Sequence, residues 1–446
     1  MTKPSNQTLP GWLTLLAGVI FGLIFVKFGN PVIFEQQVTP PGSFAEAIFF
    51  SWPPSWGICI LAALALVAVP FVKFSRPASV PAVLLMAVWF VWQFVSATQS
   101  VSGGLTNPTL VQFTGCAISL LLGWLVLARS PNGGFLWLGL TAGLAFSLWM
   151  AWDQHFGGLE ATRKAFLSMD VSKMSPEMQA QFADPTFQKK LTSTRVFGTF
   201  VYPNALAGGI LLLLPVAVAW LRNATAGMRP LIGWLATGGL MGVSAACLYW
   251  SGSKSGWLVA LVAGALLFWK TPWPSRGKLA VLGAVGVVGL GAFFIRYSGY
   301  FQKGATSVEA RLDYWEAAVK TANRNPLVGT GPGTFQIPYR QIKAPESEMA
   351  RLAHNDYLQQ ASDSGWLGGL SFIAGLGIAA VALFRKLWAS ASWIHWSAFI
   401  GWLALSLQAV SEFPLYIPAL AWPAFLILGW LVAVKPVSPD DNSAKG

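Results

Sequence analysis

Charged residues are scarce in this sequence. They make up 10% of the 446 residues, whereas 54% are hydrophobic; an ordinary soluble domain has roughly 25% charged residues. This balance excludes a soluble enzyme. The 23 Trp and 30 Phe, many of them at the ends of apolar runs, are typical of side chains anchored at the bilayer–water interface. The sequence therefore predicts an all-α, polytopic integral membrane protein.

Cysteine and several catalytic motifs are also missing or rare. The three cysteines, Cys59, Cys116 and Cys247, lie inside apolar runs and are too scattered for a disulfide framework or a thiolate metal site. The sequence contains no GxxxxGK[ST] phosphate loop, no Asp-x-Asp pair, no HExxH and no GxSxG. These absences argue against an ATP-driven pump and a nucleotide-sugar donor. We therefore predict no metal and no cofactor.

Long apolar stretches account for most of the chain. A helix crosses the hydrocarbon core with roughly 17 to 25 residues, and twelve stretches approach or reach that length. The eighth is short and nearly continuous with the seventh, which favours a tight hairpin around 251–255. The candidate spans are 11–29, 55–72, 80–97, 109–128, 133–152, 203–221, 231–250, 256–269, 279–296, 365–384, 392–411 and 416–434.

Lys and Arg residues are distributed unevenly between the connections. With a cytoplasmic N-terminus, the inside connections carry thirteen of them, whereas the four short outside connections carry only Lys254. The positive-inside rule then places both termini in the cytoplasm. The net charge of +12 is thus mainly a topology signal, and no nucleic-acid partner is expected. The first span lacks the features of a cleaved signal peptide, so we expect it to be retained.

Two outside loops are long, and they concentrate the polar residues. They hold most of the seventeen acidic residues, together with His155 and His354. The expected organisation is five spans, a loop, four spans, a larger and mostly helical loop with the catalytic motifs, three spans and a cytoplasmic tail. The corresponding segments are 1–152, 153–202, 203–296, 297–364, 365–434 and 435–446.

The second long loop has the pattern of two helices separated by glycine turns. The first helix begins with a capping-box spacing at Thr306, and Gly331 and Gly333 permit a tight turn or a close approach to a ligand. A second helix is expected at about 348–362, with His354 on one side. Histidine can take a proton from an attacking hydroxyl near neutral pH, although a lone histidine in a loop is more often structural.

Three cations on the outside are candidates for anion binding. Arg195 lies near the start of the sixth span, where a charge is expensive unless it is paired or faces a polar cavity. Lys254 is flanked by hydroxyls and glycines, which suit a phosphate oxygen. Arg311 lies near the start of its helix, where its charge opposes the helix dipole. The alternatives are a structural or solvated charge and, for Lys254, an interfacial lysine that extends to the headgroups.

The predicted topology places these candidates on one side of the membrane. Such a group can hold a lipid-linked diphosphate by electrostatics while a base activates an acceptor, without a metal. Glu35 and Glu46 in the first outside loop are alternative bases, although isolated loop acids are more often solvated. The favoured set is Arg195, Lys254, Arg311 and His354.

Several segments between 195 and 368 resemble those of the bacterial O-antigen ligase and polymerase superfamily. The resemblance is strongest in four motifs of the second loop and its end, which occur in the family's order. Two earlier segments resemble the family as well, and the hydropathy pattern extends the likeness to the whole chain. The segments are RLDYW at 311–315, NPLVGTGPGTF at 325–335, AHNDYLQ at 353–359, GWLG at 365–368, RVFGTF at 195–200 with Asn204, and SKSG at 253–256.

The resemblance implies a membrane enzyme that moves a glycan from a polyprenyl diphosphate carrier to an acceptor hydroxyl, without ATP, cofactor or essential metal. By resemblance, Arg195, Lys254 and Arg311 would bind the diphosphate and help it leave, and His354 would activate the acceptor. The family more often has arginine at position 254, and lysine offers a point charge in place of a bidentate fork. Supporting roles would fall to Asn204, Ser253, Gly331, Gly333, Asn355, Asp356 and Tyr357.

The resemblance also implies a bacterial inner-membrane location with the site on the periplasmic side. The expected partners are an undecaprenyl diphosphate-linked glycan, an acceptor and membrane lipids. Ligation of O-antigen to the lipid A core is the favoured reaction, while a repeat-unit polymerase and a protein O-oligosaccharyltransferase share these motifs and remain alternatives. A solute or bicarbonate transporter and a non-catalytic scaffold are further alternatives. Transporters usually place charges mid-membrane, whereas the predicted spans here are nearly free of charge.

Overall fold

The secondary structure is helical. A computed structural model describes residues 9–130, 132–168, 179, 192–299, 306–345 and 347–433, and within these ranges every regular element is a helix. The predicted tail at 435–446 and most of 169–191 in the first long loop lie outside the described residues. Because seven of the helices are long and apolar enough to cross a membrane, the chain is an all-α polytopic membrane protein, as predicted.

Helices occupy all twelve predicted spans. Among them, α1, α12 and α19 are shorter apolar helices, while the seven long apolar helices include α10, α11 and α17. The twelve helices are α1 (Gly11–Lys27), α3 (Pro54–Ala68), α4 (Val80–Ala97), α5 (Gly103–Leu125), α6 (Leu136–Asp153), α10 (Pro203–Ala224), α11 (Pro230–Ser251), α12 (Lys254–Trp269), α13 (Ser275–Arg296), α17 (Asp356–Trp388), α18 (Trp393–Gln408) and α19 (Pro418–Ala433).

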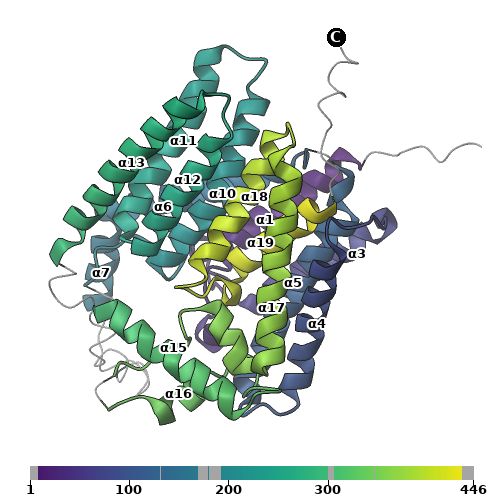
Figure 1. The fold of residues 1–446 in the computed structure, drawn as a ribbon. Helices are drawn as coiled ribbons and strands as arrows, with labels where there is room; N and C mark the ends of the chain where they lie inside the picture. Colours follow the sequence, from purple (N-terminus) through teal and green to yellow (C-terminus); the bar gives the residue numbers. More distant parts are fainter. Residues whose placement is uncertain are drawn as a thin grey trace, which may run out of the picture.

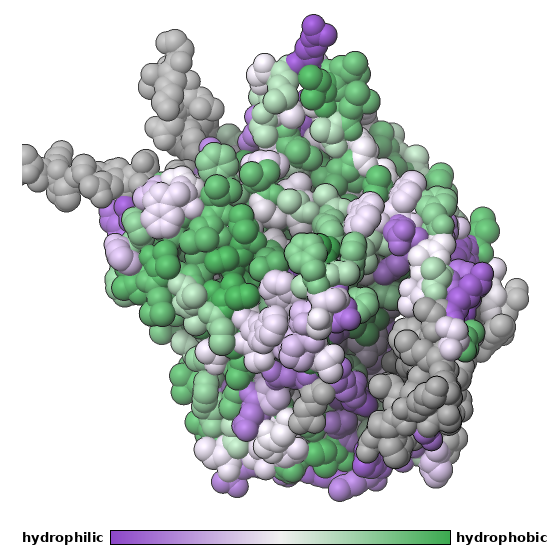
Figure 2. Space-filling view, turned by 180° about the vertical axis from the view of Figure 1, so that it is seen from behind, coloured by the Kyte–Doolittle hydropathy of each residue, from purple (hydrophilic) through white to green (hydrophobic). Residues whose placement is uncertain are grey.

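The long helices pack in pairs that are distant in sequence: α5 with α19, α1 with α6, α4 with α17 and α10 with α18. Small residues allow this close approach, because a Cβ added to Gly22 of α1 would lie 2.4 Å from the carbonyl oxygen of Gly139 of α6. Figure 2 shows hydrophobic residues over much of the upper part of one face and hydrophilic residues gathered toward its lower end. On this face, the hydrophilic residues lie mainly toward the lower end.

Short helices lie toward this lower end. Figure 1 shows α7 (Leu159–Leu167), α15 (Thr306–Arg324) and α16 (Gln336–Ile342) toward the lower end of the bundle, with α15 lying across it. The first helix predicted in the second long loop is thus confirmed as α15. The other short elements are η1 (Val32–Gln37), α2 (Phe44–Phe49), η2 (Val69–Phe71), η3 (Leu127–Arg129), η4 (Gln154–Gly158) and η6 (Pro414–Tyr416).

The predicted start of the second helix in this loop is wrong. The helix was expected to cover about 348–362, but α17 begins at Asp356, so His354 lies before the helix with a φ of 50°. The Asn355 side chain explains the boundary, because its oxygen accepts hydrogen bonds from the N–H groups of Tyr357 and Leu358 as an N-cap. His354 is therefore presented by a loop in a left-handed conformation that non-glycine residues seldom adopt.

The helix that starts at Asp356 is interrupted at Ser364 and Gly365, close to the predicted boundary between the loop helix and the span that starts at 365. The chain kinks at Ser364 and Gly365, where Gly365 has a φ of 71°, and the same helix then continues to Trp388. A Cβ on Gly365 would lie 2.3 Å from the carbonyl oxygen of Leu327. The loop helix and the tenth predicted span are therefore one element, α17, bent where only glycine fits.

The tight hairpin predicted around 251–255 is confirmed. Helix α11 ends at Ser251, and α12 begins at Lys254 with Ser253 as its N-cap. Gly252 between them has a φ of 60°, the left-handed conformation that glycine adopts at low cost. Lys254, expected in a connection, is thus the first residue of a helix.

Candidate functional site

A buried carboxylate, Glu412, contacts several of the residues selected from the sequence. It lies between α18 and η6, and its side chain is 8% exposed. Its Oε1 accepts hydrogen bonds of 2.6 Å from Arg311 Nη2 and 2.6 Å from Asn204 Nδ2. Its Oε2 lies 3.4 Å from His354 Nδ1. One carboxylate thus joins α15, the start of α10 and the loop before α17.

The guanidinium of Arg311 is held in place by three acceptors. Besides Glu412, its Nε donates to the carbonyl oxygen of Ser411 at 3.0 Å, and its Nη1 donates to that of Ser307 at 3.1 Å. Three of its five N–H groups are therefore engaged among the described residues, which leaves two for an anionic ligand. The pairing with Glu412 explains a cation in a helix position that the helix dipole disfavours.

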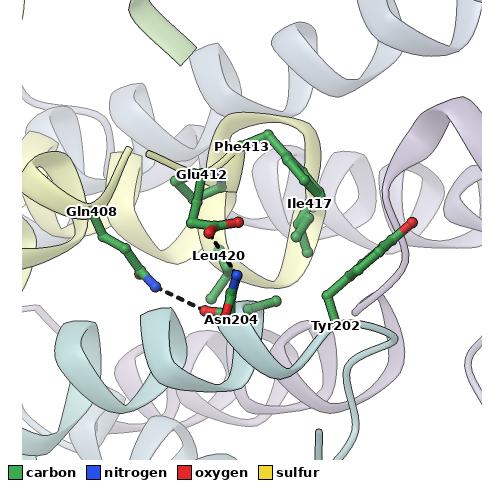
Figure 3. Close-up of a pocket in the computed structure, with 9 residues that line it drawn as sticks. Tyr202, Asn204, Gln408, Glu412, Phe413, Ile417 and Leu420 are labelled. Carbon is green, nitrogen blue, oxygen red and sulfur yellow. Dashed lines mark hydrogen bonds between the residues drawn. The ribbon is translucent and has the colours of Figure 1, made fainter. Parts of the chain in front are cut away.

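Asn204 extends the network from Glu412 to Arg195. Its Oδ1 accepts a hydrogen bond of 2.7 Å from Arg195 Nη2 while its Nδ2 donates to Glu412. The backbone oxygen of Asn204 accepts a further bond of 2.8 Å from Gln408 Nε2. Figure 3 shows Asn204 between Gln408 and Glu412, with both interactions drawn. The amide therefore bridges a cation and a carboxylate that do not bond directly.

Arg195 also contacts the hairpin between α11 and α12. Its Nε donates to the carbonyl oxygen of Ser251 at 2.6 Å. A Cβ on Gly252 would lie 3.2 Å from the same Nε, so the glycine leaves room for the guanidinium. On the other side, Gln154 Oε1 accepts hydrogen bonds from the N–H groups of Phe197 and Gly198. The segment that carries Arg195 is thus fixed from both sides.

The imidazole of His354 lies between two aromatic rings and Glu412. Its centroid is 4.8 Å from that of Phe413 and 5.9 Å from that of Tyr314. The side chain is 29% exposed, yet Nδ1 is buried, and Glu412 is the group that faces it. The ring therefore presents one nitrogen to a carboxylate and keeps an exposed portion for a ligand.

The residues that follow His354 connect α17 to the segment containing Glu412. The N–H of Asp356 donates to the carbonyl oxygen of Ala409, and its Oδ2 accepts from the N–H of Leu415, each at 2.9 Å. The hydroxyl of Tyr357 donates to the carbonyl oxygen of Ser406 at 2.7 Å. These bonds flank Glu412 on both sides, so Asp356 and Tyr357 tie the start of α17 to the segment that carries Glu412.

Lys254 lies close enough to this network to interact with its charges. Its Nζ lies 5.1 Å from the centre of the Tyr297 ring, and its charge is within range of Arg195, Arg311 and Glu412. Arg296, which we did not select from the sequence, is in range as well. The side chain of Ser253 caps α12 by accepting from the N–H of Gly256 at 3.2 Å.

The two predicted glycines serve packing in the structure. Gly331 and Gly333 have φ values of 108° and 78°, and their N–H groups donate to the backbone and side chain of Asp363, each at 2.8 Å. A Cβ at these positions would lie 2.3 Å from Ser100 and 2.2 Å from Thr109. Gly331 thus allows the turn to pack against the α4–α5 connection, and Gly333 allows it to pack against α5.

Burial and neighbouring charges act in opposite directions on the pKa values of Glu412 and Arg195. Burial would raise the pKa of Glu412, but its contacts with His354 and Arg311 outweigh this effect and hold the pKa below its ordinary value. Burial lowers the pKa of Arg195, and the charge of Glu412 opposes that change. Several cations therefore surround one carboxylate, which leaves a net positive charge. In the described part of the chain, His, Cys, Asp and Glu form no cluster of three or more suited to a metal ion.

Glu412 was missed in the sequence analysis, although a signal for it exists. It is the one acidic residue between Asp363 and Asp440, and the predicted topology places it in a short outside connection. The two acids considered in the sequence analysis lie elsewhere. Glu35 is in η1, and the half-buried Glu46 accepts a hydrogen bond from the N–H of Gly42 at 2.7 Å. An isolated acid on the same side as several unexplained cations was the available clue.

A small pocket opens beside Glu412. Figure 3 shows Asn204 and Glu412 pointing toward each other in it, with Tyr202 at one side and its hydroxyl directed away from Glu412. Its lining combines this polar pair with apolar side chains from the start of α10 and the segment after α18. The residues are Tyr202, Asn204, Ala205, Gln408, Glu412, Phe413, Pro414, Ile417 and Leu420.

Comparison with known proteins bears on part of this site. Residues 239–373 match the family model described as O-antigen ligase, which confirms the predicted resemblance over a segment that includes Lys254, Arg311 and His354. A Haemophilus influenzae protein described as uncharacterized is 27% identical over 146 residues, covering 28% of this chain. The match spans 37% of that relative's length. Arg195, Asn204 and Glu412 lie outside the matched domain.

Proposed function

Because residues 239–373 match the O-antigen ligase family, we propose that this membrane protein transfers a glycan from a polyprenyl diphosphate carrier to an acceptor hydroxyl. The proposed donor is an undecaprenyl diphosphate-linked O-antigen, and the proposed acceptor is the lipid A core. In this proposal the reaction requires neither ATP nor a metal ion. The free energy that drives the transfer is released when the bond between the sugar and the diphosphate breaks.

The observation that carries this proposal is the position of Glu412 between the cations and His354. Its carboxylate lies 3.4 Å from His354 Nδ1 and 2.6 Å from Arg311 Nη2, and Asn204 connects it to Arg195. A carboxylate beside one imidazole nitrogen orients the ring and stabilises the imidazolium. The same carboxylate holds the guanidinium of Arg311 next to His354. Groups that could activate the acceptor hydroxyl and stabilise the leaving diphosphate therefore lie side by side.

In the proposed mechanism, His354 is the general base. With a proton on Nδ1 directed at Glu412, Nε2 accepts the proton of the acceptor hydroxyl. The hydroxyl oxygen forms a bond to the anomeric carbon of the donor sugar as the bond from that carbon to the diphosphate oxygen breaks. The proton remains on His354 until it is released to solvent, and the polyprenyl diphosphate leaves as an anion.

The cations serve the leaving group in this proposal. Arg311 and Arg195 have N–H donors beyond those that acceptors in the described residues use. Lys254 adds a third positive charge within electrostatic range. Fixed donors and charges stabilise the negative charge that develops on a diphosphate oxygen without having to reorganise. The hydrogen bonds that fix the two guanidinium groups thus serve catalysis as well as structure.

We place the site on the periplasmic face of the bacterial inner membrane, with both termini in the cytoplasm. This orientation is supported by the excess of Lys and Arg in the predicted inside connections. It also suits the hydrophilic residues that lie toward the lower end of the face in Figure 2, the end of the bundle where α15 lies (Figure 1). A lipid-linked donor would then reach the site from the outer leaflet.

The decisive experiment is a reconstituted transfer assay. The native chain, His354→Ala and Arg311→Ala are each incubated with a polyprenyl diphosphate-linked glycan and candidate acceptors, in the presence of a chelator and without ATP. We expect transfer by the native chain and a loss of about 100-fold or more in His354→Ala, the range for removal of a general base. Arg311→Ala is expected to lose activity as well.

The product identifies the reaction. Glycan on the lipid A core indicates a ligase, a longer carrier-linked glycan indicates a repeat-unit polymerase, and glycan on a protein hydroxyl indicates an O-oligosaccharyltransferase. Arg340→Gln in α16 serves as a control for charge loss at the same end of the bundle. Full activity of His354→Ala, or no transfer to any acceptor by the native chain, would contradict the proposed function and favour the transporter alternative.

A further inference from the structure

A cation outside the network of Glu412, Arg351, lies three residues before His354. Arg351 is exposed, and its guanidinium carbon lies 4.6 Å from the centre of the Phe34 ring in η1. Among the described residues, its side chain makes no hydrogen bond or ion pair. Arg195 and Arg311, by contrast, each donate to protein acceptors. Arg351 thus contacts the Phe34 ring and has no counterion within the described part of the chain.

Stacking leaves the anion-binding edge of the guanidinium available. A planar guanidinium packs its face on an aromatic ring, while its N–H groups point outward in the plane and match a carboxylate or phosphate. The contact with Phe34 therefore restricts Arg351 without using its N–H donors. Preorganisation of this kind reduces the entropy lost when an anion binds.

A continuous series of aromatic rings connects Arg351 to His354. The Phe34 ring lies 6.5 Å from that of Tyr202, which lies 5.4 Å from that of Phe413, which lies 4.8 Å from His354. Tyr202 and Phe413 also line the pocket beside Glu412, and Figure 3 shows Tyr202 directed outward from that polar pair. Aromatic surfaces with a few fixed polar groups are typical of ligand sites, and they suit the apolar face of a sugar ring.

This arrangement lies apart from the proposed diphosphate site. Arg195, Lys254 and Arg311 are coupled to one another and to Glu412, whereas Arg351 and Phe34 are reached through Tyr202 and Phe413. His354 lies between the two groups in contact with both Glu412 and Phe413. A base between two binding regions is what a transfer from one bound glycan to another requires.

We propose that Arg351, Phe34 and Tyr202 form an acceptor subsite that binds a phosphate or carboxylate group on the acceptor glycan. This inference rests on the proposed function, because it assigns the second substrate of that reaction. Arg351 is three residues before His354, so an anion held there places a neighbouring hydroxyl near the base. The acceptor class is therefore an anionic glycan, and Arg351 determines specificity without taking part in the chemical step.

The test compares two acceptors that differ only in their anionic groups. A phosphorylated lipid A core and the same core after phosphatase treatment are offered to the native chain, Arg351→Gln, Arg351→Lys and Phe34→Leu, with Arg340→Gln as the matched charge control. We expect Arg351→Gln to raise the KM for the phosphorylated acceptor by about tenfold or more, the loss associated with one charge-assisted hydrogen bond. Its kcat and its KM for the donor should stay unchanged.

Further outcomes distinguish this subsite from a general effect of charge loss or misfolding. Arg351→Lys should have an intermediate KM for the phosphorylated acceptor, because lysine keeps the positive charge but cannot donate two parallel hydrogen bonds. Phe34→Leu should raise the same KM, because the guanidinium loses its contact with the aromatic ring. With the dephosphorylated acceptor, the native chain and Arg351→Gln should have the same KM. Equal losses on both acceptors, a raised KM for the donor, or an unchanged Arg351→Gln would overturn the inference while leaving the transfer function intact. Failure of the native chain to transfer to either acceptor, or to any other, would instead contradict the proposed function.

Discussion

The side chain of Asp356 accepts a hydrogen bond of 2.9 Å from the backbone N–H of Leu415. This bond ties the first turn of α17, two residues after His354, to the segment that carries Glu412. A second bond of 2.9 Å, from the N–H of Asp356 to the carbonyl oxygen of Ala409, holds the other side of that segment. The distance between His354 and Glu412 is therefore set by backbone contacts of a buried neighbour.

Asp356→Ala should lower both stability and turnover. It leaves the N–H of Leu415 without its acceptor in a buried position, which costs about 1–3 kcal/mol, and it frees Glu412 to move relative to His354. Asp356→Asn keeps an acceptor oxygen and should retain most of the activity. Thermal unfolding in detergent and kcat in the transfer assay measure the two effects. Equal kcat values for the Ala and Asn variants would show that the hydrogen bond does not position the site.

Glu412→Gln should separate catalysis from donor binding. The amide is nearly isosteric but removes the charge that faces His354 and Arg311, so we expect kcat to fall by about tenfold or more. The KM for the donor should not rise, because the remaining cations make the site more positive. Steady-state kinetics with the donor as the varied substrate measure both constants. Glu35→Gln, which changes an acid outside this network, is the control, and a raised donor KM with unchanged kcat would contradict the assignment.

The stability contribution of Glu412 should depend on pH in a definite direction. Its pKa is held below the ordinary value of 4.5 in the folded protein, so the native state favours the ionised form. The contribution is fully present above that value and is lost as the pH falls through the lower, folded pKa. The difference in Tm between the native chain and Glu412→Gln should therefore be constant from pH 7 to about pH 5 and shrink below about pH 4.5. A difference that shrinks already between pH 7 and pH 5 would mean that the pKa is raised instead.

Gly252→Ala should weaken the donor site through Arg195. Alanine at a φ of 60° costs roughly 1–2 kcal/mol, and the added Cβ would lie 3.2 Å from Arg195 Nε. We expect a lower Tm and a higher KM for the donor, because the guanidinium must shift from the carbonyl oxygen of Ser251. Gly264→Ala in α12 is the matched control, since a Cβ there meets nothing within 4 Å. The same donor KM in both variants would argue that Arg195 does not contact the donor.

The helical elements were largely predictable from local pattern. Runs of apolar residues long enough to cross a membrane can bury their backbone polar groups only as helices in lipid, so twelve runs gave twelve helices. The hairpin at Gly252 followed from the shortness of the sequence between two runs. The start of α17 was missed because Asn355 competes as an N-cap. The break at Gly365 agrees with the predicted boundary between the loop helix and the tenth span, since glycine adopts the positive φ found there at low cost.

The amino-acid sequence by itself determined the membrane character, the helix positions and the chemical types present on one side: two arginines, a lysine and a histidine in a recognisable order. These properties depend on composition and on spacing along the chain. The tertiary structure alone decided that Glu412, from a separate segment, joins Arg311, Asn204 and His354. It also decided that Gly331 and Gly333 serve packing and that Arg351 stacks on Phe34. The reason is physical: contacts between residues far apart in sequence depend on how the helices pack, and no local pattern encodes them.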